Sequence, residues 1–178
     1  MFDTYYGIAL SSLITAIASI PPHIVIDYSY FIQLSCYLNI AKSFNISKCG
    51  WIEKIHHFIV ITTCFIILNS NSNYSKDFYT QYNVVQIQNF STIFLNLRRV
   101  IKHSYIDYWF IVTFFVFRVR FNYMLYTNKI SFDEICIKND YISTNLCINF
   151  YNISMYLLSM MNNYWFILIL LKIKRKYL

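Results

Sequence analysis

The stretch that decides the fold is Gln88-Asn-Phe-Ser-Thr-Ile-Phe-Leu-Asn-Leu-Arg-Arg99. At about 100° per residue, its polar side chains fall within roughly one quarter of a helix circumference, and Phe, Ile and Leu cover much of the remainder. The polar stripe consists of Gln88, Asn89, Thr92, Asn96 and Arg99. Unsatisfied amides are costly in hydrocarbon, so this stripe must face other helices or a wet cavity. It is the first indication of function.

The composition is that of a membrane protein. The chain has 178 residues, of which 57% are hydrophobic and 13% charged, with a mean hydropathy of +0.42. Soluble domains carry about 25% charged residues, and a soluble chain of this composition would need a larger core than it can enclose. We therefore predict an all-α, multi-pass transmembrane helix bundle that forms a single domain over residues 1–178. The net charge of +7 does not indicate nucleic acid, because the basic residues lie between apolar segments or at the C-terminus.

Six transmembrane helices are expected. Pro21-Pro22 ends the first, since neither proline can continue a helix. Several spans are shorter than the ~20 residues that cross the hydrocarbon, so they extend into their polar flanks or pack within the bundle. The expected spans are 5–20, 23–41, 55–68, 84–97, 105–126 and 151–171.

Connecting segments alternate in charge. Basic residues dominate in 42–54, in 98–104 and in the tail from Lys172, whereas 70–83 and 127–150 are neutral or acidic. This alternation predicts that both termini lie on the cytoplasmic side.

The cysteines give no metal motif, because no C-x-x-C pair occurs. Cys136 and Cys147 fall in the expected lumenal segment 127–150, where either a disulfide or free thiols would fit.

His56 and His57 are the candidate catalytic residues. Glu53 lies three and four residues before them, within helical reach of either ring, so a His could act as base or nucleophile toward an acyl substrate. The alternative is a pair of interfacial histidines that reach the membrane surface beside Trp51 and Lys54. No metal site is expected, since adjacent helical histidines point about 100° apart.

Further polar residues inside the spans are candidates for binding a substrate. An arginine within an apolar span, as at Arg118, is a functional candidate by default. Instead of binding a substrate, the amides could hydrogen-bond one helix to another. The arginines could instead mark the boundary of the membrane. The candidate substrate-binding residues are Asn89, Thr92, Asn96, Arg98, Arg118 and Asn163.

Several short stretches, taken in order, carry a resemblance. They are Lys54-Ile-His-His-Phe-Ile-Val, Ser91-Thr-Ile-Phe-Leu-Asn-Leu-Arg98, Phe114-Phe-Val-Phe-Arg118 and Asn163-Tyr-Trp-Phe. Together they resemble the TLC-domain family of multi-pass endoplasmic-reticulum proteins, which includes ceramide synthases and translocon-associated membrane proteins. The resemblance runs from about residue 25 to the end and leaves 1–24 as a divergent first span.

The departures favour the non-synthase branch. Ile93 replaces the family's proline, Asn89 replaces an acidic residue, and no acid occurs in the region from Tyr30 to Ser35. The Asp-rich signature of ceramide synthases is absent from 84–102.

The resemblance implies an endoplasmic-reticulum protein that binds or regulates lipids of acyl or sphingolipid homeostasis in a pocket between spans. One alternative is a ceramide-synthase-like N-acyltransferase that uses His56 and His57, with acyl-CoA as a substrate. Another is a protein that interacts with cargo or with the translocon. Membrane lipids are the expected partners, no cofactor is expected, and a homodimer is compatible with the pattern.

Overall fold

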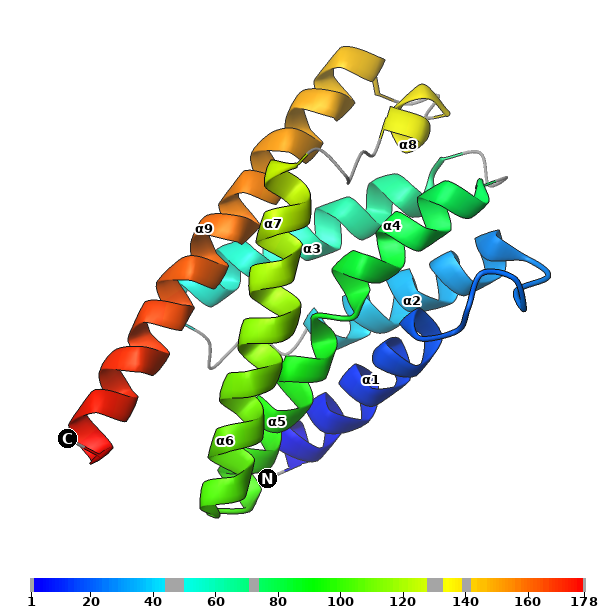
Figure 1. The fold of residues 1–178 in the computed structure, drawn as a ribbon. Coiled ribbons are helices and arrows are strands. Elements are labelled where there is room, and N and C mark those ends of the chain that lie inside the picture. The colour runs from blue at the N-terminus through cyan, green and yellow to red at the C-terminus, as the bar shows by residue number, and fades with distance from the viewer. Residues whose placement is uncertain (1, 44–49, 71–73, 128–132, 139–141, 178) are drawn as a thin grey trace.

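The chain folds into helices, and the described residues contain no β-strand. The computed structural model describes residues 2–43, 50–70, 74–127, 133–138 and 142–177 (Figure 1). The prediction of an all-α fold is confirmed. The elements are α1 (Phe2–Ala18), α2 (Tyr28–Ser43), α3 (Trp51–Leu68), α4 (Lys76–Gln86), α5 (Asn89–Val100), α6 (Ser104–Phe114), the π-helix η1 (Phe115–Val119), α7 (Arg120–Tyr126), α8 (Asp133–Ile137) and α9 (Thr144–Tyr177).

Two helices of the described chain are long and apolar enough to cross a membrane. They are the segments Trp51–Leu68 and Thr144–Arg175, and Thr4–Ala18 is a shorter apolar helix. Only 22% and 28% of the residues in the most apolar windows of these two helices are buried, whereas a core helix of a soluble protein is mostly buried. These helices correspond to the third and sixth expected spans. By length and apolarity, α3 and α9 alone meet the requirement among the described helices.

The expected span 84–97 is not one helix. The chain turns at Ile87 and Gln88, so that α4 and α5 meet at a bend (Figure 1). The Asn89 side chain donates to the Gln86 carbonyl at 3.0 Å, while the backbone N–H of Phe90 bonds to Ile87, three residues back. A side chain that occupies a backbone carbonyl in this way competes with the helix and favours a break.

The expected span 105–126 is continuous but irregular. The helices α6 and α7 are joined by η1, whose five residues have the wider i→i+5 winding of a π-helix. The last span is longer than expected, since α9 has 34 residues.

Helix α1 lies along α5, where Gly7 permits a close approach. A Cβ at Gly7 would lie 2.8 Å from Nδ2 of Asn96, which is too close for a real contact. The opposite half of the bundle holds the main core, in which α2, α3, α4, α7, α8 and α9 contribute buried side chains. Its largest fully buried members include Ile32, Ile67, Phe78, Tyr79, Phe121 and Tyr151.

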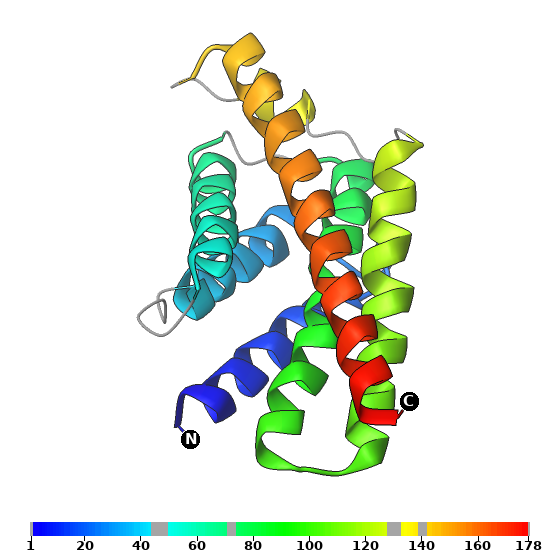
Figure 2. The same cartoon turned by 90° about the vertical axis from the view of Figure 1, so that its left-hand side faces the viewer.

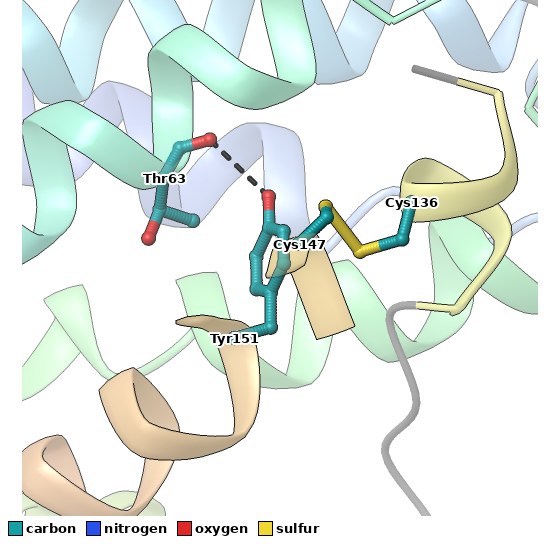
Figure 3. Close-up of a disulfide and its surroundings, with 4 residues drawn as sticks. All are labelled: Thr63, Cys136, Cys147 and Tyr151. Carbon is teal, nitrogen blue, oxygen red and sulfur yellow. Dashed lines mark hydrogen bonds between the residues drawn. A yellow bond between two sulfur atoms is a disulfide. The ribbon is translucent and has the colours of Figure 1, made fainter. Parts of the chain in front are cut away.

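A disulfide attaches the short α8 to the start of α9. Cys136 and Cys147 are bonded with Cα atoms 5.3 Å apart, so the disulfide alternative of the sequence analysis is the one that the structure contains (Figure 3). One turn further along α9, the Tyr151 hydroxyl donates to the backbone carbonyl of Thr63 at 3.3 Å.

Helix α8 is also bonded to the start of α4 through Glu134. This carboxylate accepts hydrogen bonds from the backbone N–H of Ser75 at 2.8 Å and from Nζ of Lys138 at 2.8 Å. Burial raises the pKa of Glu134, but the hydrogen bonds from Lys138 and Ser75 outweigh it and hold the pKa below its ordinary value of 4.5. Both chain termini lie at the end of the bundle opposite α8 (Figures 1 and 2).

Candidate functional site

Arg118 is the centre of a buried polar network. Its Nε donates to Ser91 Oγ at 3.0 Å, its Nη1 to Asn162 Oδ1 at 2.6 Å and its Nη2 to Thr92 Oγ1 at 3.4 Å. Asn162 in turn donates from Nδ2 to Gln88 Oε1 at 3.1 Å. The guanidinium therefore joins η1 to α5 and α9 through neutral acceptors.

The π-helix has a local consequence for this arginine. Wider winding changes the direction in which the residues of η1 point, and single π turns are common at functional sites. Arg118 of η1 is partly buried in the network, whereas Arg120, the first residue of α7, is exposed. Arg118 and Arg120, two residues apart, therefore have different environments.

Aromatic rings surround the Arg118 guanidinium. Its Cζ lies 4.9 Å from the centroid of Phe114 and 5.7 Å from that of Trp165. The Trp165 ring also meets the His56 ring edge to face at 5.5 Å, and His56 is in similar contact with His57. Cation–π contacts stabilise a desolvated guanidinium without neutralising it. The site therefore keeps its positive charge.

A second cation, Lys42 of α2, lies near this network and lines the same cavity as Arg118. Its Nζ donates to Asn89 Oδ1. The Asn89 amide donates to Gln86 Oε1 at 3.5 Å, and the same oxygen accepts from Asn39 Nδ2 at 2.7 Å. These amides connect α2 to the bend between α4 and α5.

The polar network surrounds a small cavity of about 90 Å³, here called the inner cavity. Both cations and both candidate histidines line it, and no Asp or Glu occurs among its described lining residues. The polar lining includes Lys42, His56, His57, Asn89, Thr92 and Arg118.

A much larger cavity of about 940 Å³, here called the outer cavity, lies between α5, α6 and α9. Its walls are mainly apolar, with Leu95, Ile111 and Leu168 among them. Thr92 and Arg118 line both cavities. The polar network therefore lies at one boundary of a large, mainly apolar space.

A salt bridge borders the outer cavity. Nε of Arg98 lies 2.8 Å from Oδ1 of Asp107, and the Arg98 guanidinium also lies 4.8 Å from the centroid of Phe110. Glu53 lines the same cavity, but its Oε2 accepts a hydrogen bond from the backbone N–H of Gly50 at the start of α3. Its carboxylate therefore caps the helix.

The structure brings most of the predicted site residues together. Those that line the inner cavity are His56, His57, Asn89, Thr92 and Arg118, and Arg98 lines the outer cavity. Asn96 is buried against α1, where it accepts from Arg99 Nη1 at 3.5 Å. Asn163 accepts from Asn122 Nδ2 at 2.6 Å. Asn163 therefore joins α9 to α7, Asn96 packs close to Gly7 of α1, and neither residue is among the described lining of these two cavities.

Sequence reasoning missed Lys42 and Asn162 as site residues. Lys42 was assigned to a positive connecting segment. Asn162 was passed over because the polar pattern of the last span pointed to its neighbour Asn163. The buried side of α9 runs one residue earlier, through Tyr151, Met155, Ser159 and Asn162, and this i, i+4, i+8, i+11 spacing is the signal that could have found it.

Comparison with known proteins found no matching family model, no matching curated protein and no matching solved structure.

Proposed function

We propose that this chain is a membrane-embedded helix bundle that binds a lipid in the outer cavity. The observation that carries the proposal is the cavity itself, about 940 Å³ with mainly apolar walls, bounded at one point by the buried Arg118 network. Ligand sites usually enclose about 300–1,000 Å³ and combine apolar walls with a few placed polar groups. The apolar walls suit the acyl chain of a lipid, and the polar network suits its headgroup.

The surface supports a membrane location. Large apolar side chains are exposed along α9, among them Ile153, Met160 and Ile167, and others are exposed on α3, such as Phe58 and Phe65. A soluble monomer rarely exposes so much contiguous apolar surface. Lipid tails would cover these faces.

The charge distribution supports the topology. Basic residues of the α5 end and of the α9 end gather where both termini lie, while acidic Asp133 and Glu134 of α8 lie at the opposite end (Figures 1 and 2). Positive segments remain on the cytoplasmic side. We therefore place both termini in the cytoplasm, in a multi-pass arrangement of up to six crossings in the endoplasmic reticulum, as the TLC-like stretches imply.

The experiment blocks the outer cavity and measures the lipid that remains bound. Leu168 and Leu170 are neighbours on α9 with almost equal exposed fractions, 44% and 46%, but only Leu168 is among the described lining of the cavity. Leu168→Trp should reduce the lipid that co-purifies from a detergent-solubilised preparation by about tenfold, equivalent to about 1.4 kcal/mol, as measured by quantitative mass spectrometry. Leu170→Trp should leave it unchanged. Equal lipid content in the two variants would contradict the proposal.

A second candidate function is N-acyl transfer. His56 and His57 line the inner cavity beside Arg118, and the buried Nδ1 of His56 makes no hydrogen bond with the described residues. Such an imidazole could take the proton of an amine that attacks an acyl-CoA carbonyl, forming the C–N bond as the C–S bond breaks and free CoA thiol leaves.

An assay with acyl-CoA and a sphingoid base separates the two functions. Ceramide formation that is lost in His56→Ala, but kept in the exposed-site control His103→Ala, would establish the enzyme. Lipid binding without ceramide would favour the first proposal.

A further inference from the structure

We propose that the headgroup bound at this site is an anion, a carboxylate or a phosphate, held in the inner cavity between Lys42 and Arg118. The identity of its tail rests on the lipid-binding function proposed above. The anion site itself rests on the charge and hydrogen bonding of the inner cavity alone.

The first argument is charge balance. Arg118 donates to Ser91, Thr92 and Asn162, and Lys42 donates to Asn89, so every one of these acceptors is a neutral oxygen. A buried cation in a helical bundle normally has a carboxylate partner, because desolvated charge is expensive. Two cations lining one cavity also repel each other. An anionic ligand would remove both costs.

The neighbouring carboxylates are already engaged. Among the described lining residues of the outer cavity, the acidic ones are Glu53 and Asp107. Asp107 pairs with Arg98, and Glu53 accepts from the backbone of Gly50. Neither of these carboxylates lines the inner cavity. The charge of Lys42 and Arg118 is therefore left for a ligand.

The second argument is the supply of donors. The bonds of Arg118 to described residues use three of its five N–H groups, and the bond of Lys42 uses one of three. The buried Nδ1 of His56 can donate as well when it carries a proton. A carboxylate or a phosphate accepts several such bonds at once, which a neutral hydroxyl headgroup cannot.

The third argument is size and continuity. A volume of about 90 Å³ exceeds the ~30 Å³ that one water occupies in the liquid, so it has room for a carboxylate or a phosphate group, and the outer cavity is about ten times larger. Thr92 and Arg118 line both cavities, so an anion on Arg118 directs an attached chain into the outer cavity.

The experiment compares four probes on the full chain in phosphatidylcholine nanodiscs. Oleate, oleoyl lysophosphatidate and monoolein share one acyl chain and differ in headgroup, while inorganic phosphate has no chain. Binding is measured by equilibrium displacement for the wild type, Lys42→Met and Arg118→Met. Matched controls remove exposed charges near the same positions, in Lys54→Met and Arg120→Met. Should Arg118→Met fail to fold, Lys42→Met and Lys42→Arg complete the series.

We expect at least one anionic lipid to bind about tenfold more tightly than monoolein. Lys42→Met and Arg118→Met should abolish that preference, Lys42→Arg should retain it, and both controls should resemble the wild type. Equal binding of all three lipids would overturn the anion site and leave the lipid cavity standing. Binding of inorganic phosphate that depends on Lys42, without binding of any lipid, would support the anion site and overturn lipid binding. No binding of any probe would overturn both.

Discussion

Asn162 of α9 is the side chain that links Arg118 to the bend between α4 and α5, and its replacement by Leu should loosen the bundle. Its Oδ1 accepts from Arg118 at 2.6 Å, its Nδ2 donates to Gln88 at 3.1 Å, and only 3% of the residue is exposed. A hydrogen bond to a charged group contributes about 1.5–3 kcal/mol in soluble proteins, and one between membrane helices about 0.6 kcal/mol on average. We therefore expect Asn162→Leu to lower the free energy of unfolding by about 2 kcal/mol.

The adjacent Asn163 provides the matched control. With the described residues it makes one hydrogen bond, which it accepts from the neutral amide of Asn122, and it is exposed. Asn163→Leu should therefore cost less than about 1 kcal/mol. For a chain of this length, about 2 kcal/mol corresponds to a fall in Tm of about 4–8 °C.

The assay uses thiols that the fold buries. Cys36 and Cys64 are free and buried, so a thiol-reactive fluorophore reports their exposure as the protein unfolds in detergent. A Cys49→Ser background keeps the fifth cysteine of the sequence out of the measurement. Equal Tm values for Asn162→Leu and the wild type, or equal losses for Asn162→Leu and Asn163→Leu, would refute the role assigned to this network.

Three further predictions concern the packing of α1 and the attachment of α8. Gly7→Leu should lower stability by about 1–3 kcal/mol, because it forces Asn96 away from α1, and Gly7→Ala should cost less; thermal unfolding measures both. Cys136→Ser should cost about 2–3 kcal/mol by opening a short loop, and should free Cys147 for alkylation under nonreducing conditions. Because the folded-state pKa of Glu134 is depressed, its carboxylate stabilises the fold above pH 4.5, and this stabilisation is lost as the pH falls through the folded pKa. Chemical denaturation across that pH window should show a smaller fall in the free energy of unfolding for Glu134→Gln than for the wild type.

Helix positions were largely predictable where one strong local signal acts. Pro21-Pro22 does lie between α1 and α2, as expected. The expected start of the second helix at His23 was five residues too early, since Asp27 accepts hydrogen bonds from the backbone N–H groups of Ser29 and Tyr30 and begins α2 there. This is the ordinary preference of Asp for a helix start, so the sequence contained the signal.

The irregular helices could not be predicted from periodicity. The polar stripe through Gln88 and Asn89 continues without interruption in sequence, yet the Asn89 side chain binds the Gln86 carbonyl and the helix bends there. The π-helix around Arg118 likewise depends on contacts with α5 and α9. The bend carries a local bond from a side chain to the backbone and η1 carries long-range bonds to α5 and α9, and a 3.6-residue period reports neither.

The sequence could predict which kinds of residue form the site, but it could not predict every position that lines it. Buried polar groups in an apolar chain must converge. His56, Asn89 and Arg118 line one cavity, whereas Asn96 and Asn163 are not among its described lining residues. Lys42 was counted with the basic residues of segment 42–54 because it lies near the end of its helix. In the structure, α2 packs against the bend between α4 and α5, and Lys42 bonds to Asn89 there.

The most direct test of the lipid-binding account is an experimental structure of the chain in lipid nanodiscs. The account predicts elongated density in the outer cavity, with a compact head beside Arg118 and Lys42. An outer cavity filled by protein side chains, with Arg118 paired to a carboxylate of this chain, would contradict it.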